Sequence, residues 1–182
     1  MSRINIVNPT TATGPARAML DAVQAQIGMT PNFIRLFANS PQALEAYLGF
    51  SGSLGKGQLD VKTQERIALS VSEANSCSYC VSAHTAIGQG AGLDNAEMTA
   101  ARRGTSGDSK AAAMVAFARA INTNRGEVTT AEIDAVRKAG CSDGEIVEII
   151  SQVALHTLTN LLAKASRVEI DFPVVGLMTK TN

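Results

Sequence analysis

The chain of 182 residues is poor in aromatic side chains and carries no net charge. Aromatic residues make up 4% of it, with no Trp, whereas hydrophobic residues make up 45%. Aliphatic side chains must therefore fill the core, and faces rich in Ala allow helices to approach one another closely. Because 16 basic residues balance 16 acidic ones, nothing in the charge predicts a nucleic-acid partner or an anionic membrane surface.

Long apolar runs and cysteines are also scarce. No uninterrupted apolar run approaches the roughly 18–20 residues that span a bilayer, and residues 1–9 lack the pattern of a signal peptide. We therefore expect a cytoplasmic protein with no membrane partner. There are three cysteines in all, and in that compartment cysteines are more often reactive or buried than joined in structural disulfides.

Strand patterns are nearly missing, and almost every segment has the periodicity or the end signals of a helix. The expected helices cover residues 14–27, 32–38, 41–54, 61–74, 78–90, 94–103, 110–121, 129–139 and 143–165. A weak similarity between residues 96–100 and 131–135 suggests stacked helical hairpins. The sequence therefore predicts one all-α domain with an N-terminal helix and lead-in (1–30), a core (31–165) and a C-terminal tail (166–182).

Two of the cysteines, Cys77 and Cys80, form a C-x-x-C motif where a helix is expected to begin. The free backbone N–H groups and the positive end of the helix dipole stabilise a thiolate there, and the thiolate is the nucleophile. Residues three apart on a helix lie close enough to close a disulfide. His84 follows one turn after Cys80, where its imidazole can take and return the thiol proton. This pattern predicts a thiol redox site.

An acidic residue on the preceding helix is expected to join this site. Glu65 lies twelve residues before Cys77, and the tight connection at residues 75–76 predicts that the two helices pack as a hairpin. Glu65 should then reach the cysteines or His84. Glu73 lies at the end of its helix, so we expect it to face solvent or to brace the turn.

Other chemistries for the motif are less favoured. Two thiolates, His84 and either Glu65 or His156 would make four zinc ligands, although structural zinc sites usually take their second pair from another knuckle, which this chain lacks. Attachment of c-type haem needs His directly after the second cysteine, where Val81 stands. A thioredoxin-like motif needs a βαβ setting, and the strands are missing.

Three further residues are assigned from their neighbours in the sequence. Cys141 follows Gly140 in a loop or cap, and with no activating neighbour we expect it to be structural. His156 lies among leucines in the middle of the last helix, so we expect a core or interface histidine with its hydrogen bonds satisfied. Tyr79, inside the motif, can equally hydrogen-bond near the site or simply pack.

The residues around the motif resemble those of a known family. The spacing of Glu65, the two cysteines and His84, the residues at 70–80 and the segment 170–173 are similar to the alkylhydroperoxidase D and carboxymuconolactone decarboxylase superfamily, in its peroxidase-related branch. The resemblance covers most of the chain and is weakest before about residue 31. It implies an all-helical, alkylhydroperoxidase D-like fold that assembles as a homo-oligomer.

The resemblance also implies an activity and roles for the residues. Hydroperoxides would be reduced through the cysteine pair without a cofactor, with Cys80 attacking the peroxide and Cys77 resolving it. His84 and Glu65 would form the proton relay. In alkylhydroperoxidase D a second histidine precedes the second cysteine, where this chain has Tyr79, a poor base at neutral pH. We therefore expect a shorter relay and a lower peroxidase rate.

The same pattern leaves the partners and two other functions open. The chain has no recognisable flavin or nicotinamide site, so an external dithiol of lipoyl or thioredoxin type must reopen the disulfide. The decarboxylase branch lacks the cysteine pair, so decarboxylation is not favoured. The alternatives are a disulfide reductase or redox sensor without efficient peroxidase activity, and a metal-binding structural oligomer.

Overall fold

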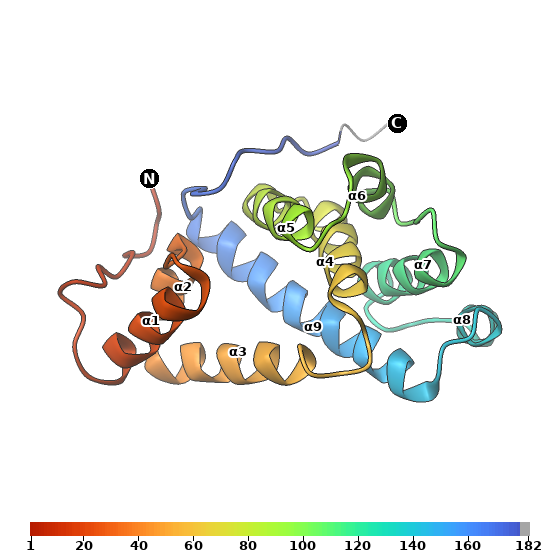
Figure 1. Ribbon diagram of the computed structural model, residues 1–182, viewed down its shortest axis with the longest axis horizontal. Coiled ribbons are helices and arrows are strands. Elements are labelled where there is room, and N and C mark those ends of the chain that lie inside the picture. Colours follow the sequence, from red (N-terminus) through yellow and green to blue (C-terminus); the bar gives the residue numbers. More distant parts are fainter. Residues whose placement is uncertain (179–182) are drawn as a thin grey trace.

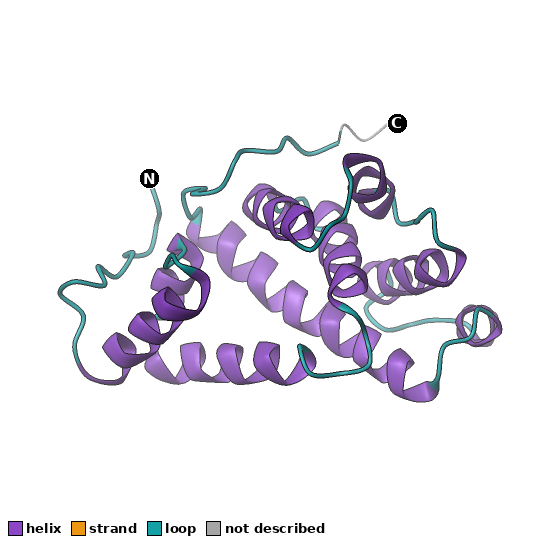
Figure 2. Cartoon of the chain, in the orientation of Figure 1, coloured by secondary structure: helices purple, strands orange, loops and turns teal. Residues whose placement is uncertain are grey.

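The computed structural model describes residues 1–178, and within that range the chain forms nine α-helices and no strand (Figures 1 and 2). The helices are α1 (Gly14–Ile27), α2 (Asn32–Phe37), α3 (Pro41–Leu54), α4 (Val61–Ala74), α5 (Ser78–Gly90), α6 (Asn95–Arg102), α7 (Ser109–Thr123), α8 (Thr130–Lys138) and α9 (Asp143–Ser166). The all-α prediction is confirmed, and the expected helix ends lie within two residues of the observed ones.

Side-chain caps explain why the helices begin where they do. The N-terminal backbone N–H groups of a helix have no partner within it, and a short polar side chain before the helix satisfies one of them. Ser40, Asp60, Asp94, Asp108, Thr129 and Ser142 all do so. Two-way capping boxes form at Thr129 and Ser142. At Asp94, which has the same spacing to Glu97, the box is only half formed, because the Glu97 carboxylate turns instead to Arg66 and Ser106.

Helix α4 lies at the centre of the fold. It packs against α5, α6, α7 and α9, and Figure 1 shows α9 running past it along the length of the molecule. One apolar cluster joins α1, α2 and α3 to the start of α5, and a second joins α4, α7, α8 and α9. The two cysteines of the motif belong to the first cluster. The predicted α4–α5 hairpin is confirmed. It brings the cysteines of the first cluster next to α4, which contributes to the second cluster.

The long helix α9 is long and apolar enough to cross a membrane, judged by length and composition alone. The sequence reading counted only uninterrupted apolar runs, so it missed this property. Half of the apolar window is buried inside the fold, where it packs against α3, α4, α5 and α7. This packing is that of a core helix.

The C-terminal segment is extended over α5 and α6 (Figure 1). The N–H of Val175 donates to the Ser82 hydroxyl at 3.0 Å. Glu73 accepts from Arg102 at 2.8 Å and from the N–H of Met178 at 2.7 Å. The prediction that Glu73 faces solvent or braces the turn is therefore wrong, because this carboxylate ties α6 and the tail to α4. The last residues of the predicted tail, 179–182, lie outside the described residues.

Candidate active site

Cys77 and Cys80 are joined in a disulfide at the N-terminus of α5, with their Cα atoms 5.3 Å apart. Cys77 is the N-cap residue of α5, and Cys80 lies in its first turn. The Cys77 sulfur accepts the backbone N–H of Cys80 at 3.4 Å. The motif therefore spans the cap and the first turn of one helix, at the positive end of its dipole, where a reduced sulfur is stabilised as a thiolate.

A partly buried cluster of asparagines holds the turn that leads into the motif. Ser76 has a positive φ of 53°, and the amide of the preceding Asn75 donates to Asn122 at 3.1 Å and to Asn160 at 2.9 Å. Asn160 is 1% exposed, so its hydrogen bonds are shielded from water and hold the turn firmly. Sequence reasoning missed this cluster, although an Asn inside an otherwise apolar helix was a signal for it.

The histidine of the motif is held by a carboxylate from the neighbouring helix. The Nδ1 atom of His84, on α5, lies 2.8 Å from Oε2 of Glu65, on α4, and Glu65 is 9% exposed. Since an ionised carboxylate only accepts hydrogen bonds, it selects the tautomer with the proton on Nδ1. The Nε2 atom of His84 is then left as a base. The structure thus brings Glu65 to His84, one of the two contacts that the sequence predicted.

An apolar cavity of about 150 Å³ opens beside this pair. Cys80 and His84 both line it, and Cys77 is not among the lining residues. The remaining walls come from α1, α2, α3, α5, α9 and the tail: Ile27, Pro31, Phe33, Ile34, Tyr47, Tyr79, Ala83, Ile87, His156, Thr159 and Phe172. A molecule that enters the cavity therefore meets the sulfur of Cys80 and the imidazole of His84 together.

The hydroxyl of Tyr79 binds structural partners. It donates to Oδ1 of Asp171 at 2.8 Å and accepts the backbone N–H of Phe33 at 3.2 Å. Asp171 also accepts the N–H of Asn32 at 2.6 Å. Burial raises the pKa of Tyr79, and the Asp171 carboxylate raises it further. Of the two roles considered for Tyr79, hydrogen bonding is the one observed, and it fastens the tail and α2 into the cavity wall.

A second tyrosine, Tyr47 on α3, lines the cavity and was not expected at the site. Its ring stacks on Phe37, with centroids 4.9 Å apart, and meets Phe33 edge-on. Burial raises the pKa of Tyr47 to about 12; a hydrogen bond with Ser51 opposes this rise and the charge of Glu65 adds to it. Tyr47 is therefore a neutral wall residue, and an isolated Tyr in an apolar helix was the signal that could have indicated it.

His156 is buried as predicted, but the prediction of satisfied hydrogen bonds is wrong. It is 6% exposed, and neither ring nitrogen has a partner among residues 1–178. Its ring meets that of His84 edge-on, with centroids 4.8 Å apart. Burial holds the pKa of His156 well below its usual range, and His84 adds to this effect, so the imidazole is neutral.

The third cysteine lies apart from this site. Cys141 is free, buried and placed between α8 and α9. Burial raises the pKa of its thiol, and the charge of Glu145 raises it further. Because the thiolate is the reactive form, the Cys141 sulfur is a weak nucleophile, in keeping with the structural role expected of it.

The zinc ligands considered from the sequence do not come together as a set. Among the residues that the structure describes, no three His, Cys, Asp or Glu side chains are placed to hold a metal ion. The sulfurs of Cys77 and Cys80 are bonded to each other, and Glu65 is bound to His84.

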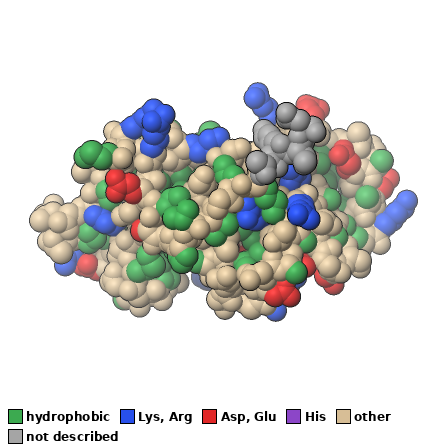
Figure 3. Space-filling model, turned by 90° about the horizontal axis from the view of Figure 1, so that it is seen from above, with side chains coloured by type: hydrophobic (Ala, Val, Ile, Leu, Met, Phe, Trp, Pro, Cys, Tyr) green, Lys and Arg blue, Asp and Glu red, His purple; other side chains and the backbone are tan. Residues whose placement is uncertain are grey.

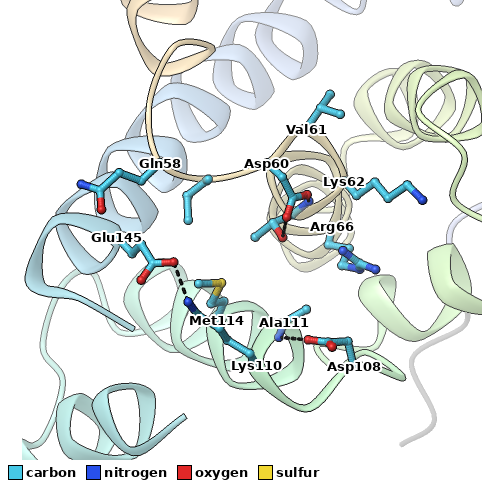
Figure 4. A pocket seen from close by; sticks show the side chains of 12 residues that line it. Gln58, Asp60, Val61, Lys62, Arg66, Asp108, Lys110, Ala111, Met114 and Glu145 are labelled. Atoms are coloured by element: carbon cyan, nitrogen blue, oxygen red, sulfur yellow. Dashed lines mark hydrogen bonds and ion pairs between the residues drawn. The ribbon is translucent and has the colours of Figure 1, made fainter. Parts of the chain in front are cut away.

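A larger cavity of about 490 Å³ lies between the starts of α4, α7 and α9 (Figure 4). Most of its charged side chains are already bound within the protein. Lys110 contacts Glu145 at 2.7 Å, and Asp108 caps α7 by accepting the N–H of Ala111 at 2.8 Å. None of the candidate site residues lines it, so cavity size alone does not mark the reactive centre.

Fold and site together define an all-helical protein with a disulfide at a helix N-terminus beside a buried carboxylate–histidine pair. Residues 41–123, which contain this site, match the model of the carboxymuconolactone decarboxylase family. None of the curated proteins matches the sequence. This match supports the resemblance of the chain to the alkylhydroperoxidase D and carboxymuconolactone decarboxylase superfamily, and the solved structures that follow show the fold.

Several solved structures share the fold. The chain is 24% identical to the alkylhydroperoxidase AhpD core, an uncharacterized peroxidase-related protein from Ralstonia eutropha JMP134, with a TM-score of 0.83 over 93% of this chain and 92% of that one. A peroxidase-related protein from Silicibacter sp. TM1040 is 24% identical, with a TM-score of 0.81 over 92% and 91%. A cysteine-to-alanine variant of the debrominase Bmp8, in complex with 2,3,4-tribromopyrrole, is 20% identical, with a TM-score of 0.78 over 94% of both chains.

Proposed function

We propose that this protein is a thiol peroxidase that reduces hydroperoxides through Cys77 and Cys80. The observation that carries the proposal is that Cys80, half of the disulfide, shares an apolar cavity with His84. His84 is in turn oriented by Glu65. A nucleophile, a base and a group that orients the base are the parts that thiol catalysis needs.

The reaction follows from these positions. Nε2 of His84 takes the proton of the Cys80 thiol, and the thiolate attacks the terminal oxygen of the hydroperoxide. A sulfur–oxygen bond forms, the oxygen–oxygen bond breaks, and the leaving alkoxide takes the proton back from His84 to become an alcohol. Cys80 is now a sulfenic acid. The Cys77 thiolate attacks its sulfur, hydroxide leaves as water with the Cys77 proton, and the disulfide closes.

An external dithiol must then reduce the disulfide, and its access is restricted. Cys77 and Cys80 are only 1% and 3% exposed. Of these two cysteines, only Cys80 lines the cavity. A narrow dithiol of lipoyl type on a flexible arm fits this route better than the broad surface of a thioredoxin-type protein. A supply of such reduced dithiols is consistent with a cytoplasmic location.

The test is the oxidation of the reduced protein by a single equivalent of cumene hydroperoxide, followed by stopped flow and thiol counting. We expect rapid loss of two thiols per peroxide, with the third thiol, Cys141, retained. The Cys141→Ala variant is the matched control and should react at the same rate. A protein that exchanges disulfides with dihydrolipoamide, but loses its thiols to peroxide no faster than free dithiothreitol, would instead be the disulfide reductase or redox sensor of the alternative hypothesis.

We further propose that the protein is a homo-oligomer in which α9 contacts a second copy. Val147, Ile150, Leu158 and Leu161 are 62%, 42%, 45% and 64% exposed, and their spacing places them along one side of the helix. The formal net charge of the chain is zero, so two copies do not repel each other overall. Figure 3 shows acidic and basic side chains interspersed on the face seen from above.

Leu161→Glu is therefore expected to reduce the mass in solution toward that of the 19.0 kDa monomer. A charge placed in an apolar interface is desolvated without a partner, which opposes association. Light scattering after size exclusion measures the mass. Val174→Glu, at an exposed apolar residue of the tail, is the control and should leave the mass unchanged. A wild-type protein that is already monomeric contradicts the proposal.

A further inference from the structure

His156 combines three properties that rarely occur together. It is almost completely buried, neither of its ring nitrogens has a partner among residues 1–178, and its side chain lines the cavity that contains Cys80 and His84. A neutral imidazole carries one donor and one acceptor, and burying them unpaired costs stability. Such a group in a cavity wall is in position to bind whatever occupies the cavity.

Most of the other polar groups of the wall already have partners, and the free Nε2 of His84 is the base of the proposed reaction. The Tyr79 hydroxyl is bound to Asp171, and the Thr159 hydroxyl donates to the carbonyl oxygen of His156 at 2.9 Å. The Nδ1 atom of His84 is bound to Glu65. Burial lowers the pKa of His156, as described above, so its imidazole meets a ligand as a neutral group. His156 is therefore the part of the wall best suited to hold a ligand's polar group.

The rest of the cavity restricts what that ligand can be. No Lys, Arg, Asp or Glu lines it, so a charged ligand would lose its water without gaining a counter-ion. Two lining residues, Ile27 and Ile87, are 55% and 44% exposed, which places the entrance among apolar side chains. Apolar cavities of roughly 150 Å³, the volume observed here, bind molecules the size of benzene.

We propose that His156 is a ligand-binding residue whose imidazole hydrogen-bonds the oxygen head group of a small, uncharged, largely apolar molecule in this cavity. If the proposed peroxidase function holds, that molecule is a hydroperoxide with a compact apolar substituent. The hydrogen bond then holds its peroxide oxygens beside the sulfur of Cys80. His156 is a positioning residue that selects the substrate, while His84 moves the proton.

The test uses the alcohol product of such a substrate, because the alcohol has the same body and an oxygen head group but does not react. We expect 2-phenylpropan-2-ol to bind the oxidised wild-type protein and to shift the imidazole ¹⁵N resonances of His156 in NMR spectra. His156→Phe should weaken this binding about tenfold, the worth of one hydrogen bond. His156→Gln, which retains a donor and an acceptor, should recover part of it. Val61→Ala, at an exposed residue of α4 that does not line this cavity, should bind as the wild type does.

A charged analogue tests the second half of the proposal. The carboxylate 2-methyl-2-phenylpropanoate has the same aromatic body, and we expect it to bind at least about tenfold more weakly than the alcohol. Equal binding of the two probes overturns the preference for uncharged ligands. Unshifted ¹⁵N resonances in the wild type overturn the role of His156, and this measurement does not depend on whether any variant folds.

These outcomes are separate from those of the peroxidase assay. Alcohol binding through His156 in a protein that does not reduce peroxides would contradict the proposed function and leave the binding site intact. The wild type could reduce peroxide rapidly while His156→Phe changes neither that rate nor the binding of the alcohol. This result would contradict only the inference about His156.

Discussion

Cys80→Ser is expected to lower the rate of hydroperoxide reduction by a factor on the order of 10³ or more, because a serine hydroxyl is a far weaker nucleophile than a thiolate. Cys77→Ser should behave differently. With Cys80 intact, the first attack on the peroxide still occurs, but no disulfide can close. The variant should therefore react once with peroxide and accumulate a sulfenic acid.

Stopped-flow kinetics with cumene hydroperoxide measures the first difference, and mass spectrometry after trapping with dimedone measures the second. The two variants are matched controls for each other, since each retains one sulfur of the pair and both sulfurs are buried. Equal rates for the wild type and Cys80→Ser would refute the peroxidase mechanism. Trapped sulfenic acid in Cys80→Ser instead of Cys77→Ser would exchange the roles of the two cysteines.

Glu65→Gln is expected to lower kcat/KM for the same peroxide about 10²-fold, at the lower end of what general acid–base catalysis contributes. Glutamine keeps the size of the side chain and can still accept a hydrogen bond from Nδ1 of His84. It lacks the negative charge that stabilises the imidazolium formed when His84 takes the thiol proton. The loss should therefore appear in the rate of disulfide formation, whereas the fold is retained.

Glu73→Gln is the matched control, because Glu73 is a second, partly buried carboxylate of α4 that binds Arg102 and the tail and does not line the cavity. This variant should lower the melting temperature and leave the peroxidase rate unchanged. If Glu65→Gln leaves the rate unchanged, Glu65 only supports the structure and His84 acts without it.

Local features of the sequence were enough to predict the helices and part of the site. A cap such as Asp60 or Ser142 acts within one turn, so its effect is visible from neighbouring residues. The cysteines and His84 lie within one helix and its cap, whose geometry is known in advance. Glu65 could be placed because a short turn joins its helix to theirs, which leaves little freedom in how the two helices pack.

The remaining features depended on which helix faces meet, and periodicity does not contain that information. A helical pattern shows that His156 lies on a buried face, but only the packing of α9 against α5 brings it to His84 and leaves its nitrogens unpaired. The partners of Glu73 and the hydroxyl of Tyr79 come from α6, α2 and the tail, far along the chain. By itself, the sequence determined the all-helical fold and the placement of the cysteine pair and His84 on one helix. Tertiary structure decided which side chains surround them, because contacts between distant segments depend on how whole helices pack together.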